Sequence, residues 1–410
     1  MATRTLRLDI TSERGAVLVH VAIALVGLIG FSAFVIDYGV LWAARRQAQN
    51  AADAAALAGA ISLAYVDFND QGLARQSALA VAAQNKVWGE APDVTAGDVT
   101  FPSCPPGSPG AGTNSCIRVD VFRNQRAGGN PLPTFFGKLV GIDEQGVRAT
   151  ATAEALFGNS TDCVKPFAIP DRWQELRDDA GPAGWSEEDT FERYVQNGRD
   201  AGALFTPTAD AYPPGSGFSP QSVALGGGDH GRYLVLKNGG PQNAIRPGWF
   251  NPVVVNPSEG PGGNNYNNNI ATCDPTVIGP GTVLEVEPGN MIGPTKQGME
   301  DLIALDPYAE WDADLYGPNR GGVTGGCMGA GTCATSPRLV AIPVYDPDAY
   351  NLAAAGGRTT INIVKVLGFF VDRMQGNDVG GWITTYPAKA NAGMGGVPGN
   401  NFVISVALVR

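Results

Sequence analysis

The sequence predicts an α+β protein. A long N-terminal transmembrane helix continues into a second helical segment and a small β-sheet, and a β-rich, loop-heavy C-terminal domain follows. Three observations predict this class. Residues 16–36 are uninterruptedly apolar, and residues 37–64 are rich in alanine and contain no proline. From about residue 98 apolar and polar residues alternate as in strands, among loops that draw on 55 glycines and 30 prolines.

The first element is the apolar run Ala16–Ile36, in which the polar side chains are His20 and Ser32. At about 1.5 Å of rise per residue, a helix of this length spans roughly 30 Å, the thickness of a bilayer's hydrocarbon core. A cleaved signal peptide is the alternative, but its apolar region usually has about 7–15 residues and a small-x-small site soon after it. After the span, the first Ala-x-Ala lies near Ala56, at Ala52-Asp53-Ala54. We therefore predict a retained membrane anchor.

The flanking charges favour a cytoplasmic N-terminus by a small margin. Arg4, Arg7 and Arg14 precede the span, whereas Arg45 and Arg46 follow it. An excess of basic residues is typical of the cytoplasmic side.

The cysteines indicate an oxidising compartment beyond the span. Their number is even, no CxxC occurs, and all of them follow the apolar run, which favours disulfides over zinc or redox chemistry. Six cysteines allow 15 pairings in principle. Spacing favours two short pairs and leaves one long pair: Cys104–Cys116, Cys327–Cys333 and Cys163–Cys273.

Charge excludes two classes of partner. The residues after Ile36 carry 37 acids and 25 bases, a net charge of −12. This balance argues against nucleic acid and against electrostatic docking on anionic lipid. About 370 residues lie beyond the span, enough for two domains with cores of their own.

The helix is expected to continue through residues 37–64 with a stripe of small side chains at three- and four-residue steps: Ala44, Ala48, Ala51, Ala55 and Ala58. Such a stripe lets another helix approach closely, although alanine is also simply the best helix former. Asp37 ends the apolar run as either a functional exit residue or an ordinary interfacial carboxylate. His20 either faces a partner or bonds a backbone carbonyl near the cytoplasmic end.

Two units are expected after the span. In the first, residues 37–158, we predict a helix at Leu73–Val87 capped by Asn69 or Asp70, strands at Asp98–Phe101 and Ile117–Phe122, a short helix at Leu132–Val140 and a strand at Gly146–Phe157. In the second, residues 159–410, we predict strands at Tyr233–Lys237, Val253–Val255, Thr282–Val286, Leu339–Val344, Thr359–Leu367, Phe369–Val371 and Phe402–Val409. Short helices are predicted at Asp189–Val195 and Lys296–Leu305, and a low-complexity loop at Ser258–Asn269. Residues 1–15 are expected to form a cytoplasmic tail.

The N-terminal pattern resembles a known family. It combines an Arg14-Gly15 start, the apolar span, an Asp37-Tyr38-Gly39 exit and the helix QNAADAAALAGA of residues 49–60. This pattern is similar to that of the TadG-like proteins of Flp/Tad (tight adherence) pilus assembly, over about the first 65 residues. The resemblance implies a bacterial envelope protein with a pilin-like stalk that serves as a minor or anchoring component and is not a catalyst.

Two features of such families are not carried over. Related pilins are cut after a glycine with glutamate five residues on, but the fifth residue after Gly15 is His20. Peptidase processing is therefore left open. Some TadG-like proteins carry a metal site built on Asp-x-Ser-x-Ser, and this sequence has no such motif.

The remaining polar motifs predict structure rather than catalysis. His230 lies in the loop Gly226–Gly231, but a zinc set or a Ser–His–Asp triad would need partners that the motif does not supply. The acidic stretch Asp306–Asp314 lacks the spacing of an EF-hand. We predict no catalytic residue, cofactor, metal or small-molecule substrate.

The leading hypothesis is a single-pass protein of the bacterial inner membrane with its C-terminal domains exported. It would act through helix packing and an exported contact domain, with the membrane and other pilus-assembly proteins or sister subunits as partners. A membrane-anchored binding module or adhesin, and an anchored hydrolase, are the alternatives.

Overall fold

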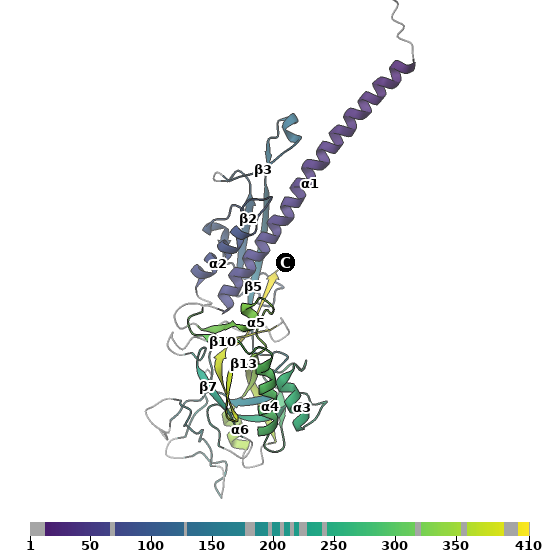
Figure 1. Ribbon diagram of the computed structural model, residues 1–410. Coiled ribbons are helices and arrows are strands. Elements are labelled where there is room, and N and C mark those ends of the chain that lie inside the picture. The colour runs from purple at the N-terminus through teal and green to yellow at the C-terminus, as the bar shows by residue number, and fades with distance from the viewer. Residues whose placement is uncertain are drawn as a thin grey trace, which may run out of the picture.

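The computed structural model describes residues 13–65, 70–126, 129–176, 185–195, 199–205, 209–213, 217–220, 228–239, 244–315, 321–353, 359–388 and 401–409. Its longest element is α1 (Glu13–Tyr65), one continuous helix of 53 residues. The predicted membrane helix and the alanine-rich helix are therefore a single rod. Its first half projects away from the rest of the molecule, and its second half lies against a sheet (Figure 1).

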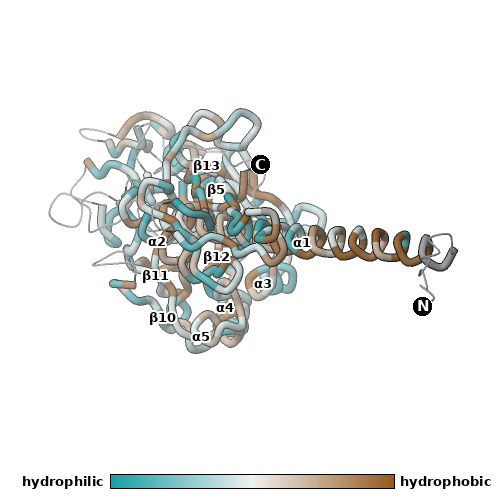
Figure 2. Tube along the Cα trace, turned by 90° about the horizontal axis from the view of Figure 1, so that it is seen from above, coloured by the Kyte–Doolittle hydropathy of each residue, from teal (hydrophilic) through white to brown (hydrophobic). Residues whose placement is uncertain are grey.

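The α1 helix changes environment near Val40. The large apolar side chains from Val17 to Ile36 are between 46% and 71% exposed. The projecting part is apolar along its whole length (Figure 2). From Val40 onward a regular series of side chains is buried. Within the described residues, α1 is the one helix long and apolar enough to cross a membrane.

The second helix, α2 (Gln71–Gln84), packs on α1 through small side chains. It begins at Asp70, whose carboxylate accepts a hydrogen bond from the Leu73 N–H at 2.9 Å. Gly59 of α1 allows a close approach, because a Cβ there would lie 3.2 Å from the Ala74 carbonyl oxygen and 2.3 Å from Ile117. The predicted second helix is thus present, and Asp70 is the cap.

The first sheet has the strand order β1-β2-β5-β16-β15. The strands are β1 (Val99–Thr100), β2 (Cys116–Arg123), β5 (Val147–Gly158), β16 (Val403–Val409) and β15 (Tyr386–Pro387). Helix α1 crosses this sheet mainly over β5. Strand β16 comes from the far end of the chain and pairs with β5 along seven residues, from Val403↔Gly158 to Val409↔Thr152. The last strand of the second unit therefore completes the sheet of the first.

The second sheet closes on itself. Its order is β12-β6-β8-β7-β14-β13-β9, with additional pairings of β12 with β13 and of β8 with β9. The strands are β6 (Phe167–Pro170), β7 (Tyr233–Asn238), β8 (Trp249–Val254), β9 (Val283–Val286), β12 (Leu339–Tyr345), β13 (Thr360–Gln375) and β14 (Asp378–Thr384). One of its cores contains Phe167, Phe250 and Phe369 together with Met299.

The remaining elements are short helices and hairpins outside the two sheets. Helices α3 (Gly263–Ala271) and α4 (Ile292–Ala304) pack on each other beside the closed sheet. The others are η1 (Ala96–Asp98), the hairpin β3 (Leu132–Pro133) with η3 (Gly137–Val140) and β4 (Glu144–Gln145), the hairpin β10 (Ala309–Asp312) with β11 (Gly322–Gly325), and the short helices α5 (Gly326–Gly329) and α6 (Pro347–Leu352).

Three of the predicted elements are wrong. Leu132–Val140 is not one helix but β3, a connecting turn and η3, because Pro133 is part of a strand pair with Glu144. Asp189–Val195 is extended, since the Phe191 N–H donates to Ile245 O and the Val195 N–H to Ala203 O. The second half of the low-complexity loop Ser258–Asn269 belongs to α3.

Part of the closed sheet was not predicted because its strands contain glycines. Strand β14, which was not predicted, contains Gly380 and Gly381, and a Cβ at Gly381 would lie 2.2 Å from the Phe370 carbonyl oxygen. At Gly368 the Cβ would lie 2.5 Å from the Thr384 carbonyl oxygen. Gly368 lies inside β13, which joins the two separately predicted runs into one strand. Close backbone approach requires glycine here, and glycine weakens the strand pattern.

Candidate assembly surface along the first helix

The exposed half of α1 ends in residues typical of a membrane interface. Tyr38 and Trp42 are 58% and 52% exposed and lie one turn apart, directly after the apolar span. The Arg46 guanidinium lies over the Trp42 ring, 4.0 Å from its centroid. Tyrosine and tryptophan gather at the level of lipid headgroups, and basic side chains extend beyond them. His20 lies on the exposed apolar part.

The alanine stripe lies in the protein's own core. Ala44, Ala48, Ala51 and Ala55 are fully buried, and Ala58 is half-buried. Their cluster includes small side chains of the sheet that face the helix: Ala149, Ala151, Ala153 and Ala155 of β5. Sequence analysis left the stripe between a seam for another helix and a composition that simply favours helix. The same cluster also contains Ala74, Ala78 and Ala82 of α2, so the small side chains allow α1 to lie close to its own sheet and to α2.

Asp37 holds the β3–η3–β4 segment against α1. Its carboxylate accepts backbone N–H groups from Phe135 at 2.7 Å, Phe136 at 3.0 Å and Gly137 at 2.6 Å. Partial burial raises the pKa of Asp37, but the three backbone donors outweigh it and hold that pKa below its usual value. Sequence analysis left the role of this residue between a functional exit and an ordinary interfacial carboxylate. The structure places it at a specific contact between residues about 100 positions apart.

A cavity of about 460 Å³ lies between α1 and this segment. Its α1 wall includes Gly30, Ala33 and Phe34, and its other wall includes Leu139 and Ile142. Both walls are therefore largely apolar, and one of them belongs to the predicted membrane span.

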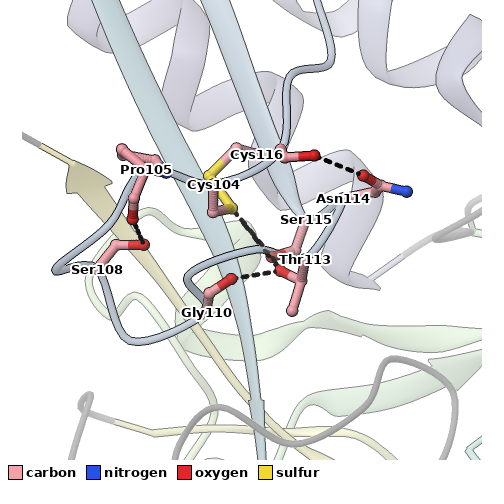
Figure 3. Close-up of a disulfide and its surroundings, with 9 residues drawn as sticks. Cys104, Pro105, Ser108, Gly110, Thr113, Asn114, Ser115 and Cys116 are labelled. Atoms are coloured by element: carbon pink, nitrogen blue, oxygen red, sulfur yellow. Dashed lines mark hydrogen bonds between the residues drawn. A yellow bond between two sulfur atoms is a disulfide. The ribbon is translucent and has the colours of Figure 1, made fainter.

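The first disulfide, Cys104–Cys116, closes a loop beside β2, with a Cα–Cα distance of 5.2 Å (Figure 3). Thr113 Oγ1 donates to the Gly110 carbonyl oxygen at 2.7 Å within this loop (Figure 3). The buried Glu154 lies opposite Cys116 on β5, and burial raises the pKa of its carboxyl. Its oxygen and the two sulfurs are within 4.8 Å of one another. Sulfurs that are joined in a disulfide are not thiolate ligands, so this cluster is not a metal site.

The other cysteines form the remaining two predicted pairs. Cys163–Cys273 ties the chain that enters the closed sheet to the end of α3, and Cys327–Cys333 closes a turn at α5. All six cysteines are thus paired.

The loop that contains His230 is built around an ionic contact. The buried carboxylate of Asp229 accepts from Arg232 at 2.9 Å and from Arg172 at 3.2 Å. The His230 ring lies beside Trp311, and its Nε2 is 3.4 Å from the Gly321 carbonyl oxygen. Gly226 and Gly227 of the predicted loop lie outside the described residues. This arrangement agrees with a structural loop.

The acidic stretch 306–314 is likewise involved in structural contacts. Asp306 accepts from the Cys327 N–H at 2.9 Å and from Ser336 Oγ at 2.6 Å, which fixes the α5 turn. Asp312 accepts from the Asp314 N–H at 2.9 Å within a local turn.

Sequence analysis missed two buried charges on either side of the β6 run FAIP. Asp171 is fully buried, and its carboxylate lies 3.0 Å from Lys365 Nζ and 2.7 Å from Tyr212 OH. Lys165 is buried and donates to the carbonyl oxygens of Asn269 and Thr272. Its burial lowers its pKa to about 8. The available signal was a charge close to each end of a short apolar run, Lys165 before FAIP and Asp171 after it.

The N-terminal part of the chain matches two known protein families. Residues 15–62 match the family described as putative Flp pilus-assembly TadE/G-like, and residues 41–153 match the putative Tad-like Flp pilus-assembly family. The predicted resemblance to TadG-like proteins of Flp/Tad pilus assembly is confirmed. The matched region contains α1, α2 and the start of the first sheet, and ends inside β5. No curated protein and no solved structure matches the chain.

Proposed function

We propose that this chain, whose N-terminal third carries the Flp pilus-assembly family regions, is a membrane-anchored, non-catalytic component of Flp pilus assembly or its secretion apparatus. The observation that carries the proposal is the division of α1 near Val40. Before this residue the helix exposes large apolar side chains, and after it the same helix is part of a protein core. Such a helix suits a lipid environment at one end and a folded body at the other.

The proposed mechanism is attachment and contact. The N-terminal half of α1 crosses the inner membrane with its N-terminus in the cytoplasm, and the body is exported. Three disulfides support an oxidising location for the body. Because most of the alanine stripe is buried in the chain's own core, partner contacts fall to the exposed membrane half of α1 and to the surface of the body.

Membrane anchoring is tested with a pair of charged substitutions in the span. Leu25 and Leu28 are 55% and 67% exposed. The double variant Leu25→Arg/Leu28→Arg adds about 2.5–3.5 kcal/mol per residue to the free energy of insertion at the bilayer centre. It should leave the carbonate-washed membrane fraction, while the matched variant Leu25→Ile/Leu28→Ile should stay. Equal retention of the two variants would contradict the anchor.

Assembly and orientation need separate measurements. Trypsin added to intact spheroplasts should digest the body if it is exported and should spare it if it is cytoplasmic. Tagged full-length chain solubilised from native membranes should co-purify with Flp pilus components, and the Leu25→Arg/Leu28→Arg variant should not. A chain that is inserted and exported but purifies without any such component would overturn the assembly function.

A further inference from the structure

The segment Leu132–Gln145, here called the flap, lies beside the membrane half of α1. It consists of β3, η3 and β4 and extends along α1 toward the end of the helix that projects from the body (Figure 1). Asp37 fixes it there through the backbone N–H groups of Phe135, Phe136 and Gly137. Gln145 Nε2 also lies 3.5 Å from the Asp37 carbonyl oxygen.

The position of the flap along α1 sets its depth in a bilayer. The cavity between the two is lined on the α1 side by residues as early as Gly30 and Ala33. Gly30 precedes Ile36, the end of the apolar span, by six residues, which is about 9 Å along a helix. A flap that shares a cavity with Gly30 therefore extends past the headgroups and into the hydrocarbon region.

The side chains at the flap tip suit this position. Leu139 is 83% exposed, and Phe135 and Ile142 are 56% and 55% exposed. Lys138 is exposed next to Leu139 and can extend its ammonium group to the headgroups while its stem lies among apolar groups. The acidic side chains, Asp143 and Glu144, lie at the base of the flap, where Glu144 belongs to β4.

We propose that the flap is a second membrane contact, which inserts Phe135, Leu139 and Ile142 into the lipid leaflet next to the body and leaves a groove for an acyl chain between itself and α1. The proposal rests on the proposed function, since it requires that α1 crosses the membrane. The occupant is lipid because the tip continues the apolar surface of the span at the same depth. Insertion is apolar and does not depend on anionic lipid, in agreement with the acidic body.

The test is a depth measurement on the full chain in vesicles of neutral phosphatidylcholine, at a low ratio of protein to lipid. A cysteine at one exposed position, introduced with the native disulfides closed, carries an environment-sensitive nitrobenzoxadiazole label. Leu139→Cys reports on the flap and Leu28→Cys on the span. Val283→Cys, on the body and 59% exposed, is the aqueous control.

The expected result is blue-shifted emission at positions 28 and 139 and quenching of both labels by spin-labelled phosphatidylcholine. The label at position 283 should show neither the blue shift nor the quenching. The label at 139 should be quenched most by spin labels at a shallow acyl position. Asp37→Ala, which removes the acceptor for the three flap N–H groups, should reduce quenching at 139 and leave quenching at 28 unchanged.

Each other outcome is decisive. Quenching at 28 without quenching at 139 overturns the flap insertion and leaves the anchor intact. No quenching at either position contradicts the anchor itself, and with it the insertion that depends on it. A blue shift at 139 without lipid quenching would mean that protein covers the tip, as in a contact with a second copy, and would overturn the lipid assignment.

Discussion

At the scale of single residues, the closed sheet depends on a buried ion pair. Asp171 accepts from Tyr212 OH and the Phe218 N–H, both at 2.7 Å, and pairs with Lys365 at 3.0 Å. Lys365 also donates to the Phe218 carbonyl oxygen at 2.9 Å. Removing one partner of such a pair destabilises the fold strongly, because the other charge is left without a counter-charge. The intact pair adds little net stability by comparison.

Replacement of Asp171 by asparagine should therefore lower the free energy of unfolding by about 3 kcal/mol, because the Lys365 ammonium, on a side chain that is 17% exposed, stays largely out of water without its counter-charge. The matched variant Asp120→Asn disturbs the pair with Arg148, in which the arginine is 55% exposed, and should cost about 1 kcal/mol or less. Urea denaturation measures both. The double variant Asp171→Asn/Lys365→Met should recover part of the loss, and no recovery would contradict the pairing argument.

Lys165 should make the free energy of unfolding depend on pH in the alkaline range. Burial lowers its folded-state pKa from 10.5 to about 8. Between these two values the unfolded chain binds more protons than the folded one, so stability rises with pH from about 8 to 10.5. Below pH 8 the full cost of burying the charge, up to about 3 kcal/mol, is present. Lys165→Met should remove this contribution, and the difference between its unfolding curves and those of the parent from pH 7 to 10.5 measures it. A constant difference across this range would refute the depressed pKa.

At the scale of elements, α1 and β5 are matched by small side chains. The stripe residues Ala51 and Ala55 are fully buried, whereas Ala58 is half-buried. The helix can lie close to β5 because the facing strand also presents alanine. The stripe is therefore buried within the chain's own core.

Ala51→Leu and Ala55→Leu should each destabilise the fold by about 1–3 kcal/mol or more through overpacking, although leucine is nearly as good a helix former as alanine. Ala58→Leu is the matched control on the same helix and should cost less. Thermal unfolding of the detergent-solubilised chain measures the effect. Equal stability of Ala55→Leu and the parent would contradict the intramolecular seam.

Local periodicity predicted the elements whose contacts are local. The long α1, the Asp70 cap and the alternating strands β2 and β5 follow from helix and strand patterns that need no knowledge of distant residues. The flap was taken for a helix because its apolar residues LPTFFGKLV are close together, whereas its shape depends on the β3–β4 pairing and on the bonds to Asp37, about 100 residues earlier. Strand β14 was missed because Gly380 and Gly381 do not look like strand residues in the sequence. They are glycines because a side chain there would collide with neighbouring strands. The same holds for the candidate site. The sequence identified Asp37 and the alanines, but their partners lie far away along the chain and were not predicted.

At the scale of the whole molecule, the chain leaves the first sheet after β5 and returns to it as β16. Seven residue pairs join β16 to β5, and Val403 and Ile404 are buried. Sequence analysis predicted this strand as part of the second unit. Its partner could not be predicted, since register with β5 is set between strands that lie about 245 residues apart.

Deletion of residues 403–410 should consequently destabilise the first sheet more than the closed one. The deletion exposes the β5 edge, and an unpaired edge strand is prone to intermolecular pairing. Hydrogen exchange should show lost protection in β5, with protection retained in β12 and β13. Size-exclusion chromatography should show increased association. Loss of protection confined to β12 and β13 would contradict the assignment of β16 to the first sheet.

The continuity of α1 has a mechanical consequence. A helix of 53 residues extends about 80 Å, and no turn or linker separates its apolar half from the half that is built into the core. In a bilayer, helix tilt responds to the thickness of the hydrocarbon layer. A body fixed to such a shaft turns with it, so a few degrees of tilt in the lipid become a displacement of several ångströms at the far end of the molecule. The chain would thus act as a lever that converts the state of the membrane into the position of its exported surface.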